Sequence, residues 1–535
     1  MFIWSSCMHP WVKQSVVYQI YPRSFNDSNS DGIGDLQGII CKLDYLLELG
    51  INTIWLSPIY ESPCDDNGYD ISNYQSILKD FGSMEDFDQL LTECHRRDIK
   101  LVMDLVINHC SDEHNWFIES KKSRDNPYSD YFHWVDEPNN WKSVFGGSAW
   151  EWSEERQQYY LHIFSKKQPD LNWSNKALRD DINAMIKWWL DKGVDGFRVD
   201  AISFLEKPQD FAALPDQDVF ATLPCNNEKI GHEYIRSFME QIHQRGAFSV
   251  GEINAVDTAE VLRYTLPERG EFQMSIVFVP PEVEVFHSDL IGYYKQQIER
   301  RIQLQEQGVW DAVFLSNHDK PRQVSLFGDD GEYWQQSAKA LAVLNLTQYG
   351  TPFLYQGEEI GMTNCYFDTI EKYNDIDTVN KYNELIAKGH TNCEALAIVR
   401  LASRDNARTP MQWTNEKYAG FSHVQPWLDV NNNKGEINVA EQQGNSSSIL
   451  NFYRNLLALR KESNCLKFGQ TTLLPSHDKV IMFERSNEAE KFIVVINLSN
   501  ESHAVNYDFS LFENILGQDI TDSIEPFGYS IYRGV

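Results

Sequence analysis

Three acidic residues each lie at the end of a short apolar run of the chain. They are Asp200 in GFRVDAI, Glu252 in FSVGEI and Asp319 in FLSNHDKPR. Each run has the length and composition of a buried strand, so each carboxylate is expected where a strand gives way to its loop. Barrel enzymes place their chemistry at such strand ends. The three acids are therefore candidates for acid/base and nucleophilic catalysis.

The neighbours of the first two acids suggest different roles. Arg198 lies two residues before Asp200, so the two side chains share one face of an extended strand. A guanidinium beside a carboxylate holds it ionised, as a nucleophile requires. Glu252 lies among apolar residues, which raise a carboxyl pKa toward that of a working general acid. Taken singly, these features also fit a structural ion pair and a structural buried glutamate.

Asp319 directly follows His318, and this pair can hydrogen-bond to adjacent hydroxyls of a sugar. The alternative is a helix N-cap, because Asp319 lies just before Pro321. The joint occurrence of three acids, in order and at strand ends, favours one site over three unrelated structural residues.

Strand-like runs alternate with amphipathic helical patterns through the first two thirds of the chain. Apolar strands alternating with helices predict a parallel sheet covered on both faces, and eight such units make a barrel. The expected strands are 15–21, 52–56, 100–107, 195–199, 248–253, 312–316 and 351–356, with a weaker one at 275–279. Expected helices include 84–97, 176–192, 334–345 and 448–461.

Two segments depart from this alternation. The stretch after Cys110 is polar, aromatic and too long for an ordinary loop, which predicts an inserted subdomain over the barrel mouth. A second excursion, from Met362 to about Pro426, is expected over the same mouth, and the last part of the chain alternates like an antiparallel sandwich. The expected units are a catalytic barrel (residues 1–109 and 171–461), an inserted subdomain B (residues 110–170) and a C-terminal β-domain (residues 462–535).

Composition narrows the class of partner. The 535 residues include 78 acidic and 47 basic side chains, a formal charge of -31. Such a surface repels nucleic acid and anionic membranes, and it suits a neutral substrate better than a phosphorylated one. The chain has no apolar run of transmembrane length and its start lacks signal-peptide features, so we expect a cytoplasmic protein, a monomer or weak homo-oligomer. The nine cysteines, without CxxC pairs, fit free thiols.

Motifs along nearly the whole chain resemble one known family. They include VVYQIYPRSF, DNGYDISNY, DLVINH, QPDLNW, GFRVDAI, NHDKPR, GTPFLYQGEEIGM and SRDNARTPMQW. Together they resemble the α-amylase superfamily (glycoside hydrolase family 13), in its oligo-1,6-glucosidase and α-glucosidase branch. The resemblance implies a TIM (β/α)8 barrel with a subdomain inserted after strand 3 and a C-terminal antiparallel β-sandwich. It also implies a retaining, exo-acting α-glucosidase that removes terminal glucose from a neutral disaccharide or oligosaccharide.

The resemblance assigns a role to each candidate. Asp200 resembles the nucleophile, Glu252 the acid/base and Asp319 the carboxylate that stabilises the transition state. An Asp66–Arg404 pair would close the pocket behind the terminal glucose and enforce action from the non-reducing end. The other implied sugar-binding residues are Tyr69, His109, Phe164, Gln168, Arg198, Ala201 and His318. We treat Arg408, four residues after Arg404, as structural.

Linkage preference depends on the residue after the nucleophile. In this branch a valine there accompanies α-1,6 preference, whereas the smaller Ala201 leaves room and favours a broad or α-1,4-preferring enzyme. A sucrose isomerase or transglucosylase, or a trehalose-6-phosphate hydrolase, is the alternative within the branch. The last would need a basic phosphate pocket, and no basic cluster is evident. A non-catalytic sugar-binding or transporter-associated relative is the alternative of a different class.

The segment DSNSDGIGD places oxygen ligands at alternate positions around a turn that glycine permits, as a hard cation needs. It is not a complete EF-hand, because Gly38 stands at its twelfth position. The resemblance implies a structural Ca2+ here, with Mg2+ or a cation-free turn as alternatives. The expected ligands are Asp27, Asn29, Asp31, Ile33 and Asp35.

Overall fold

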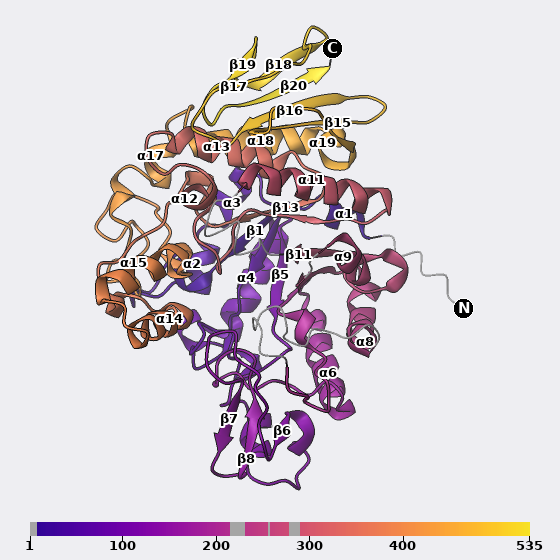
Figure 1. The fold of residues 1–535 in the computed structure, drawn as a ribbon, viewed down its shortest axis with the longest axis vertical. Helices are drawn as coiled ribbons and strands as arrows, with labels where there is room; N and C mark the ends of the chain where they lie inside the picture. The colour runs from indigo at the N-terminus through magenta and orange to yellow at the C-terminus, as the bar shows by residue number, and fades with distance from the viewer. Residues whose placement is uncertain (1–7, 215–229, 255–256, 278–288, 535) are drawn as a thin grey trace.

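The computed structural model describes residues 8–214, 230–254, 257–277 and 289–534, and its centre is an eight-stranded parallel sheet curved into a barrel (Figure 1). The sheet order is β11-β10-β9-β5-β2-β1-β13-β12. Across the remaining seam, the Ser275 hydroxyl donates to Asp311 Oδ1 at 3.5 Å. The strands are β1 (Val17–Ile20), β2 (Thr53–Leu56), β5 (Lys100–Leu105), β9 (Gly196–Val199), β10 (Phe248–Ile253), β11 (Met274–Val277), β12 (Ala312–Val313) and β13 (Thr351–Tyr355).

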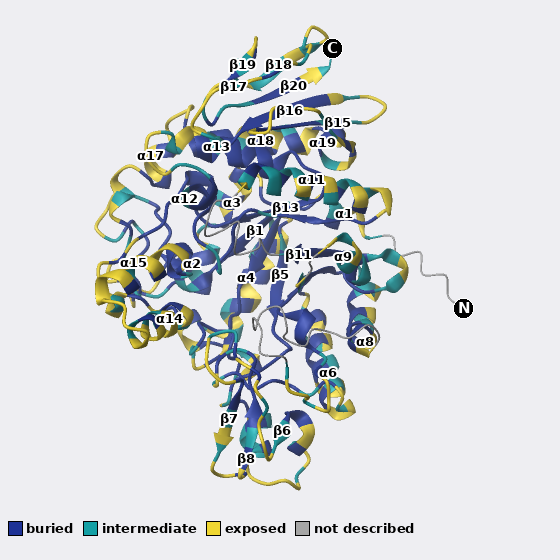
Figure 2. Ribbon diagram, viewed as in Figure 1, coloured by how far each residue is buried: buried dark blue, intermediate teal, exposed yellow. Residues whose placement is uncertain are grey.

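Helices cover the outside of the barrel, which explains why the strands are buried on both faces (Figure 2). They include α3 (Leu43–Leu49), α4 (Met84–Arg96), α6 (Lys176–Lys192), α8 (Ile230–Gln244), α9 (Thr258–Thr265), α11 (Leu290–Glu306), α13 (Trp334–Leu346) and α18 (Ile449–Glu462). The predicted barrel is confirmed. The last two residues of its eighth expected strand, Phe278 and Val279, lie outside the described residues.

The segment between β5 and α6 forms a small unit at one end of the barrel, at the bottom of Figure 1. It contains α5 (Asn115–Ser120) and a three-stranded antiparallel sheet of β6 (Trp134–Val135), β8 (Gln158–Leu161) and β7 (Trp150–Ser153). A bridge between His109 and Asp170 joins its two ends. The buried Lys207 ammonium, 3.1 Å from Asp170 Oδ2, also donates to Asn108 Oδ1 at 2.7 Å and ties this unit to the barrel.

The second excursion contains two helices that pack against each other, α14 (Ile376–Ala387) and α15 (Asn392–Ala402), followed by the short α16 (Asp405–Arg408). The sequence pattern did not predict them. Both long helices start with side-chain caps, on Asp375 and on Thr391. This excursion brings Asp375 and Arg404 to the active site described below.

The C-terminal part is a five-stranded antiparallel sheet of β14 (Gln470–Leu473), β15 (Val480–Ser486), β16 (Lys491–Asn497), β20 (Tyr529–Gly534) and β18 (Phe512–Gly517). Its residues alternate between two cores. Met482 and Val495 pack with the two-stranded ribbon of β17 (His503–Ala504) and β19 (Ser523–Ile524). Phe483 and Val494 belong to the main core, which also contains residues of α13 and α18. The predicted sandwich is confirmed. One face of its five-stranded sheet packs on the two-stranded ribbon, and the other face packs on the barrel.

The seven cysteines that the structure describes are free thiols, as predicted. Cys7 and Cys225 lie outside the described residues. Within the described segments, no helix combines the length and the apolarity needed to span a membrane.

Candidate active site

The Arg198 guanidinium contacts three carboxylates at the carboxyl ends of adjacent strands. Its Nη1 donates to Asp104 Oδ1 at 2.9 Å and to Asp200 Oδ1 at 2.7 Å, and its Nη2 donates to Glu252 Oε2 at 2.5 Å. Arg198 on β9 is in register with Asp104 on β5, and Glu252 lies on β10. Parallel pairing therefore brings residues about 50 to 150 positions apart to one end of the barrel.

The two predicted catalytic carboxyls differ in proton affinity. Burial raises the pKa of Glu252 to about 8, although the Arg198 charge opposes this. Burial also raises the pKa of Asp200, to about 6, again against Arg198. At neutral pH Glu252 is thus the proton donor and Asp200 the anion, the division that a general acid and a nucleophile require.

The two carboxyl groups are also close together. Both accept from one guanidinium, Asp200 Oδ1 from Arg198 Nη1 and Glu252 Oε2 from Arg198 Nη2. An inverting glycosidase separates its carboxyls by about 6.5–9.5 Å to admit a water, whereas a retaining one holds them about 5–5.5 Å apart. The shared guanidinium keeps the two carboxyls close together, and this favours retention.

Ala201 holds the acid/base from its backbone. The residue adopts a left-handed conformation, with φ 45° and ψ 35°, and its N–H donates to Glu252 Oε2 at 3.1 Å. An alanine in this region is strained by about 1 kcal/mol or more, so the surrounding contacts must fix it. Its methyl group belongs to an apolar cluster with Phe164 and Phe204.

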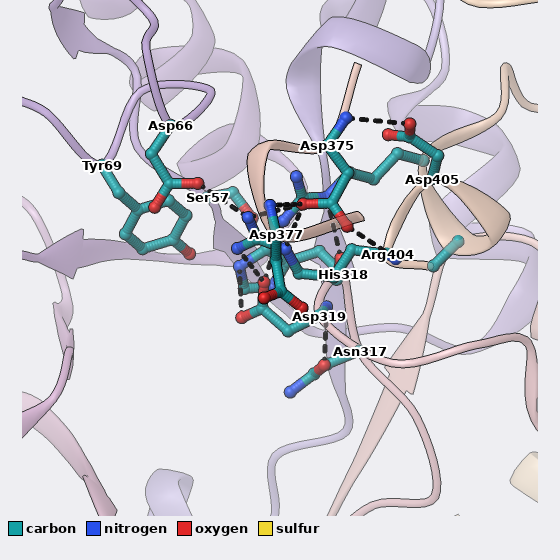
Figure 3. A network of polar contacts seen from close by, with 12 residues as sticks. Ser57, Asp66, Tyr69, Asn317, His318, Asp319, Asp375, Asp377, Arg404 and Asp405 are labelled. Atoms are coloured by element: carbon teal, nitrogen blue, oxygen red, sulfur yellow. Dashed lines mark hydrogen bonds and ion pairs between the residues drawn. The ribbon is translucent and has the colours of Figure 1, made fainter. Parts of the chain in front are cut away.

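Asp319 lies among positive and hydrogen-bonding groups (Figure 3). His318 Nε2 is 3.0 Å from Asp319 Oδ2, while Arg408 Nη2 and Arg404 Nη1 lie 2.9 and 3.4 Å from Oδ1. Burial opposes ionisation of Asp319, but the His318 contact and the two arginine charges outweigh it and hold its pKa well below its ordinary value. Asp319 is therefore an anion.

The structure excludes the alternative given for Asp319 and corrects the expectation for Arg408. Asp319 is not a helix N-cap, because α12 (Gln323–Phe327) begins after Arg322. Arg408, treated above as structural, also belongs to the site: besides its ion pair with Asp319, its Nε donates to the His318 carbonyl at 3.0 Å. Spacing along the chain could not show this, because Arg408 and Asp319 are 89 positions apart.

The predicted Asp66–Arg404 pair is present, and it extends further than expected. Arg404 Nη2 lies 3.0 Å from Asp66 Oδ1 and 2.7 Å from Asp375 Oδ1 (Figure 3). Burial opposes ionisation of Asp375, but the charges of Arg404 and Arg408 lower its pKa to about 2. The Phe145 ring centroid lies 5.1 Å from the same guanidinium. These contacts fix the Arg404 side chain between two parts of the chain.

The remaining sugar-binding candidates join the same network on two sides. Gln168 Nε2 lies 3.3 Å from Asp66 Oδ2 and 3.2 Å from His109 Nε2. Burial lowers the pKa of His109 to about 4, so its imidazole is neutral, and the Phe164 ring lies 5.1 Å from it.

Tyr69 stacks on His318 with ring centroids 5.2 Å apart and planes 4° apart. Its hydroxyl donates to Asp104 Oδ2 at 3.1 Å, which connects the Asp319 and Arg198 groups. The structure thus brings all twelve predicted catalytic and sugar-binding residues together. The residues of this network that the sequence interpretation missed are Asp104, Phe145, Asp375 and Arg408; the position of Asp104 inside the strand-like KLVMDLVI was an available signal.

The predicted cation loop lies outside this network and is closed by its own hydrogen bonds. Asp27 accepts from the backbone of Asn29, Ser30 and Gly32 and from the Ser422 hydroxyl, over 2.6–3.1 Å. The backbone N–H groups of Asp31 and Ile33 donate to Asn29 Oδ1 and Asp31 Oδ1.

Asp35 serves as the N-cap of α2 (Leu36–Ile40) and accepts from Gly38 N at 2.6 Å. The donor set is oxygen, as calcium requires. Across the described residues, however, no three His, Cys, Asp or Glu side chains converge as a metal site. The fit to a cation is therefore partial.

Comparison with known proteins agrees with this arrangement. Residues 19–469 match the family model described as alpha amylase, catalytic domain. The chain is 46% identical over 510 residues to the oligo-1,6-glucosidase of Bacillus cereus, which covers 92% of this chain and 91% of that protein. It is 44% identical over 531 residues to the glucan 1,6-alpha-glucosidase of Streptococcus pneumoniae, which covers 96% of each.

Solved structures of other activities are also similar. The trehalose-6-phosphate hydrolase of Bacillus licheniformis superposes with a TM-score of 0.92 at 38% identity, over 98% of this chain and 100% of that one. The trehalulose synthase of Pseudomonas mesoacidophila MX-45 superposes with a TM-score of 0.91 at 39% identity, over 98% of this chain and 99% of that one.

Proposed function

Because this chain belongs to the α-amylase family and is a glycoside hydrolase, we propose that Asp200, Glu252 and Asp319 carry out two-step retaining cleavage of terminal α-glucosidic bonds. The observation that carries the proposal is the shared guanidinium: Arg198 holds an ionised Asp200 beside a protonated Glu252.

In the first step Glu252 donates its proton to the glycosidic oxygen while the Asp200 carboxylate attacks the anomeric carbon. The aglycone leaves with the proton, and a covalent glucosyl-enzyme forms. In the second step the Glu252 carboxylate takes a proton from water, whose oxygen attacks the same carbon and releases Asp200. Arg198 balances the negative charge that Glu252 acquires, and Asp319 stabilises the positive charge on the sugar.

Exo-action follows from the closed side of the pocket. The Asp66–Arg404 pair, held by Asp375 and Phe145, would stand behind the terminal glucose. A chain could not extend past this group, so the enzyme would release one glucose at a time from the non-reducing end.

We propose that the preferred substrates are short α-1,6-linked oligosaccharides, with α-1,4 bonds accepted. The similarity to an oligo-1,6-glucosidase and a glucan 1,6-alpha-glucosidase supports the α-1,6 preference. The small Ala201 side chain supports the acceptance of α-1,4 bonds. A phosphorylated disaccharide is disfavoured, because the three arginines in the described part of the site, Arg198, Arg404 and Arg408, are all paired with carboxylates.

Substituting Asp200→Asn tests the proposal. Turnover of isomaltose should fall by several orders of magnitude while sugar binding survives, because the amide keeps the shape of the nucleophile but cannot attack. Asp98→Asn is the matched control: Asp98 is exposed and has φ 56°, which asparagine tolerates.

Product analysis with isomaltose, maltose, sucrose, trehalose and trehalose 6-phosphate identifies the substrate. Glucose should be released fastest from isomaltose. Unchanged turnover in the Asp200 variant, or rapid cleavage of the phosphorylated sugar alone, would contradict the assignment.

A further inference from the structure

We infer that the protein has a second sugar-binding site, in a hollow between helix α13 and the C-terminal sheet. The hollow has a volume of about 460 Å³, within the range of small-molecule sites. It lies on the outer flank of the barrel, where α13 runs beside the C-terminal strands (Figure 1). It is lined by Gly331, Glu332, Trp334, Gln335, Gln336, Lys339 and Tyr529.

Aromatic rings from both parts of the chain line this hollow and are held in place. Trp334 Nε1 donates to the Gly361 carbonyl at 2.7 Å, which fixes the half-buried indole. Tyr529 on β20 packs against Phe452 of α18, with centroids 5.1 Å apart. Rigid, amphipathic rings offer large contact area at low entropic cost, and the C–H faces of a pyranose pack on such surfaces.

The polar side chains of the hollow are available for hydrogen bonds. Glu332, Gln335 and Gln336 are exposed, and within the described part of the chain their side chains have no hydrogen-bond partner. Two amides and a carboxylate offer paired donors and acceptors, which match adjacent hydroxyls of a sugar. The Lys339 ammonium donates to the Ser447 carbonyl at 2.6 Å, and Lys339 and Glu332 together leave the lining without net formal charge.

These groups favour a short neutral oligosaccharide as the occupant. The hollow carries one positive and one negative side chain, and the whole chain has a formal charge of -31, which repels anions. That the sugar is an α-glucan rests on the proposed function. The hollow and the active site are connected by one short stretch of chain, because the segment after β12 carries Asp319 and then leads into α13. A bound chain there would raise the local concentration of substrate.

Calorimetric titration of the Asp200→Asn protein with isomaltotriose, and separately with maltotriose, tests the inference. We expect two binding events for the accepted sugar. In the double variant Gln335→Ala/Gln336→Ala the weaker event should lose at least about tenfold in affinity, while the tighter one remains. Gln296→Ala, an exposed glutamine on α11, is the control and should keep both events.

A second assay separates the proposed second site from the proposed catalytic mechanism. It measures hydrolysis of p-nitrophenyl α-glucoside by proteins that retain Asp200 and carry the same glutamine substitutions. This small substrate needs only the active site, so its kcat/KM should not change. A single binding event in the Asp200→Asn protein, or equal loss of both events in the double variant, would overturn the second site alone. Full turnover by the Asp200→Asn protein would instead overturn the proposed catalytic role.

Discussion

Arg198 sets the charge balance of the active site, because one guanidinium faces the three carboxylates of Asp104, Asp200 and Glu252. Three buried anions against one cation would leave excess negative charge in a medium of low dielectric constant, so a proton is retained. Burial and the charges of Asp200 and Asp319 place that proton on Glu252. The site therefore holds its catalytic proton before the substrate arrives.

We predict a bell-shaped dependence of kcat/KM on pH. Asp200 must be ionised, which gives an acidic limb near the pKa of about 6, and Glu252 must be protonated, which gives an alkaline limb near about 8. In Glu252→Gln, residual cleavage of an aryl glucoside with a good leaving group should lose the alkaline limb. An optimum below about pH 5, or an alkaline limb that survives in the variant, would refute this division of roles.

Arg408 positions Asp319, and we predict that Arg408→Lys lowers kcat about tenfold to a hundredfold with a smaller change in KM. Lysine cannot make both the 2.9 Å contact with Asp319 and the 3.0 Å contact with the His318 carbonyl. Arg400→Lys on α15 is the matched control, because Arg400 is exposed. Steady-state kinetics together with melting temperatures distinguish this from a loss of fold, and equal kcat in both variants would contradict it.

At the scale of elements, the barrel could be predicted because its strands are nearly continuous apolar runs with polar ends. Helices α14 and α15 could not, because only a few of their residues, such as Leu385, Ala395 and Val399, are buried and no clear apolar stripe results. The capping box of Thr391 with Glu394 was the local signal available.

The catalytic residues and several partners, such as Arg198 and His318, could be found from strand ends and motifs, whereas Asp375 and Arg408 could not. Asp375 reaches Arg404 only through the packing of α14 and α15, and Arg408 reaches Asp319 only across the barrel mouth. Ion pairs between distant segments leave no periodic trace in a single sequence.

We propose a structural calcium in the loop of residues 27–35, with no part in the chemistry. If it binds, EDTA should lower the melting temperature and added calcium should restore it, since a ligand that binds only the native state stabilises it. Asp31→Asn keeps an acceptor for the Ile33 N–H and should weaken the response. Metal analysis of the purified protein completes the test, and a calcium-free protein whose melting is insensitive to EDTA would exclude the site.

At the scale of the whole molecule, the C-terminal sheet shares the main core with α13 and α18. We therefore predict one cooperative unfolding transition in calorimetry. Val494→Ala, on the face of the sheet that packs on the barrel, should cost about 2 kcal/mol of unfolding free energy and so lower the midpoint temperature of this transition. Activity should vanish over the same temperature range. Two separate transitions, with activity lost in only one, would show that the barrel and the sheet unfold independently.

The strand order of that sheet has a consequence for synthesis. β20 is made after every other strand of the sheet, yet it lies inside it, between β16 and β18. At ribosomal rates of about 5–20 residues per second, the residues from the end of α18 to β20 take roughly 3–13 s to appear. During this interval β18 lacks its partner β20 and one edge of β16 is unpaired, so we expect the nascent chain to depend on chaperones until β20 is made.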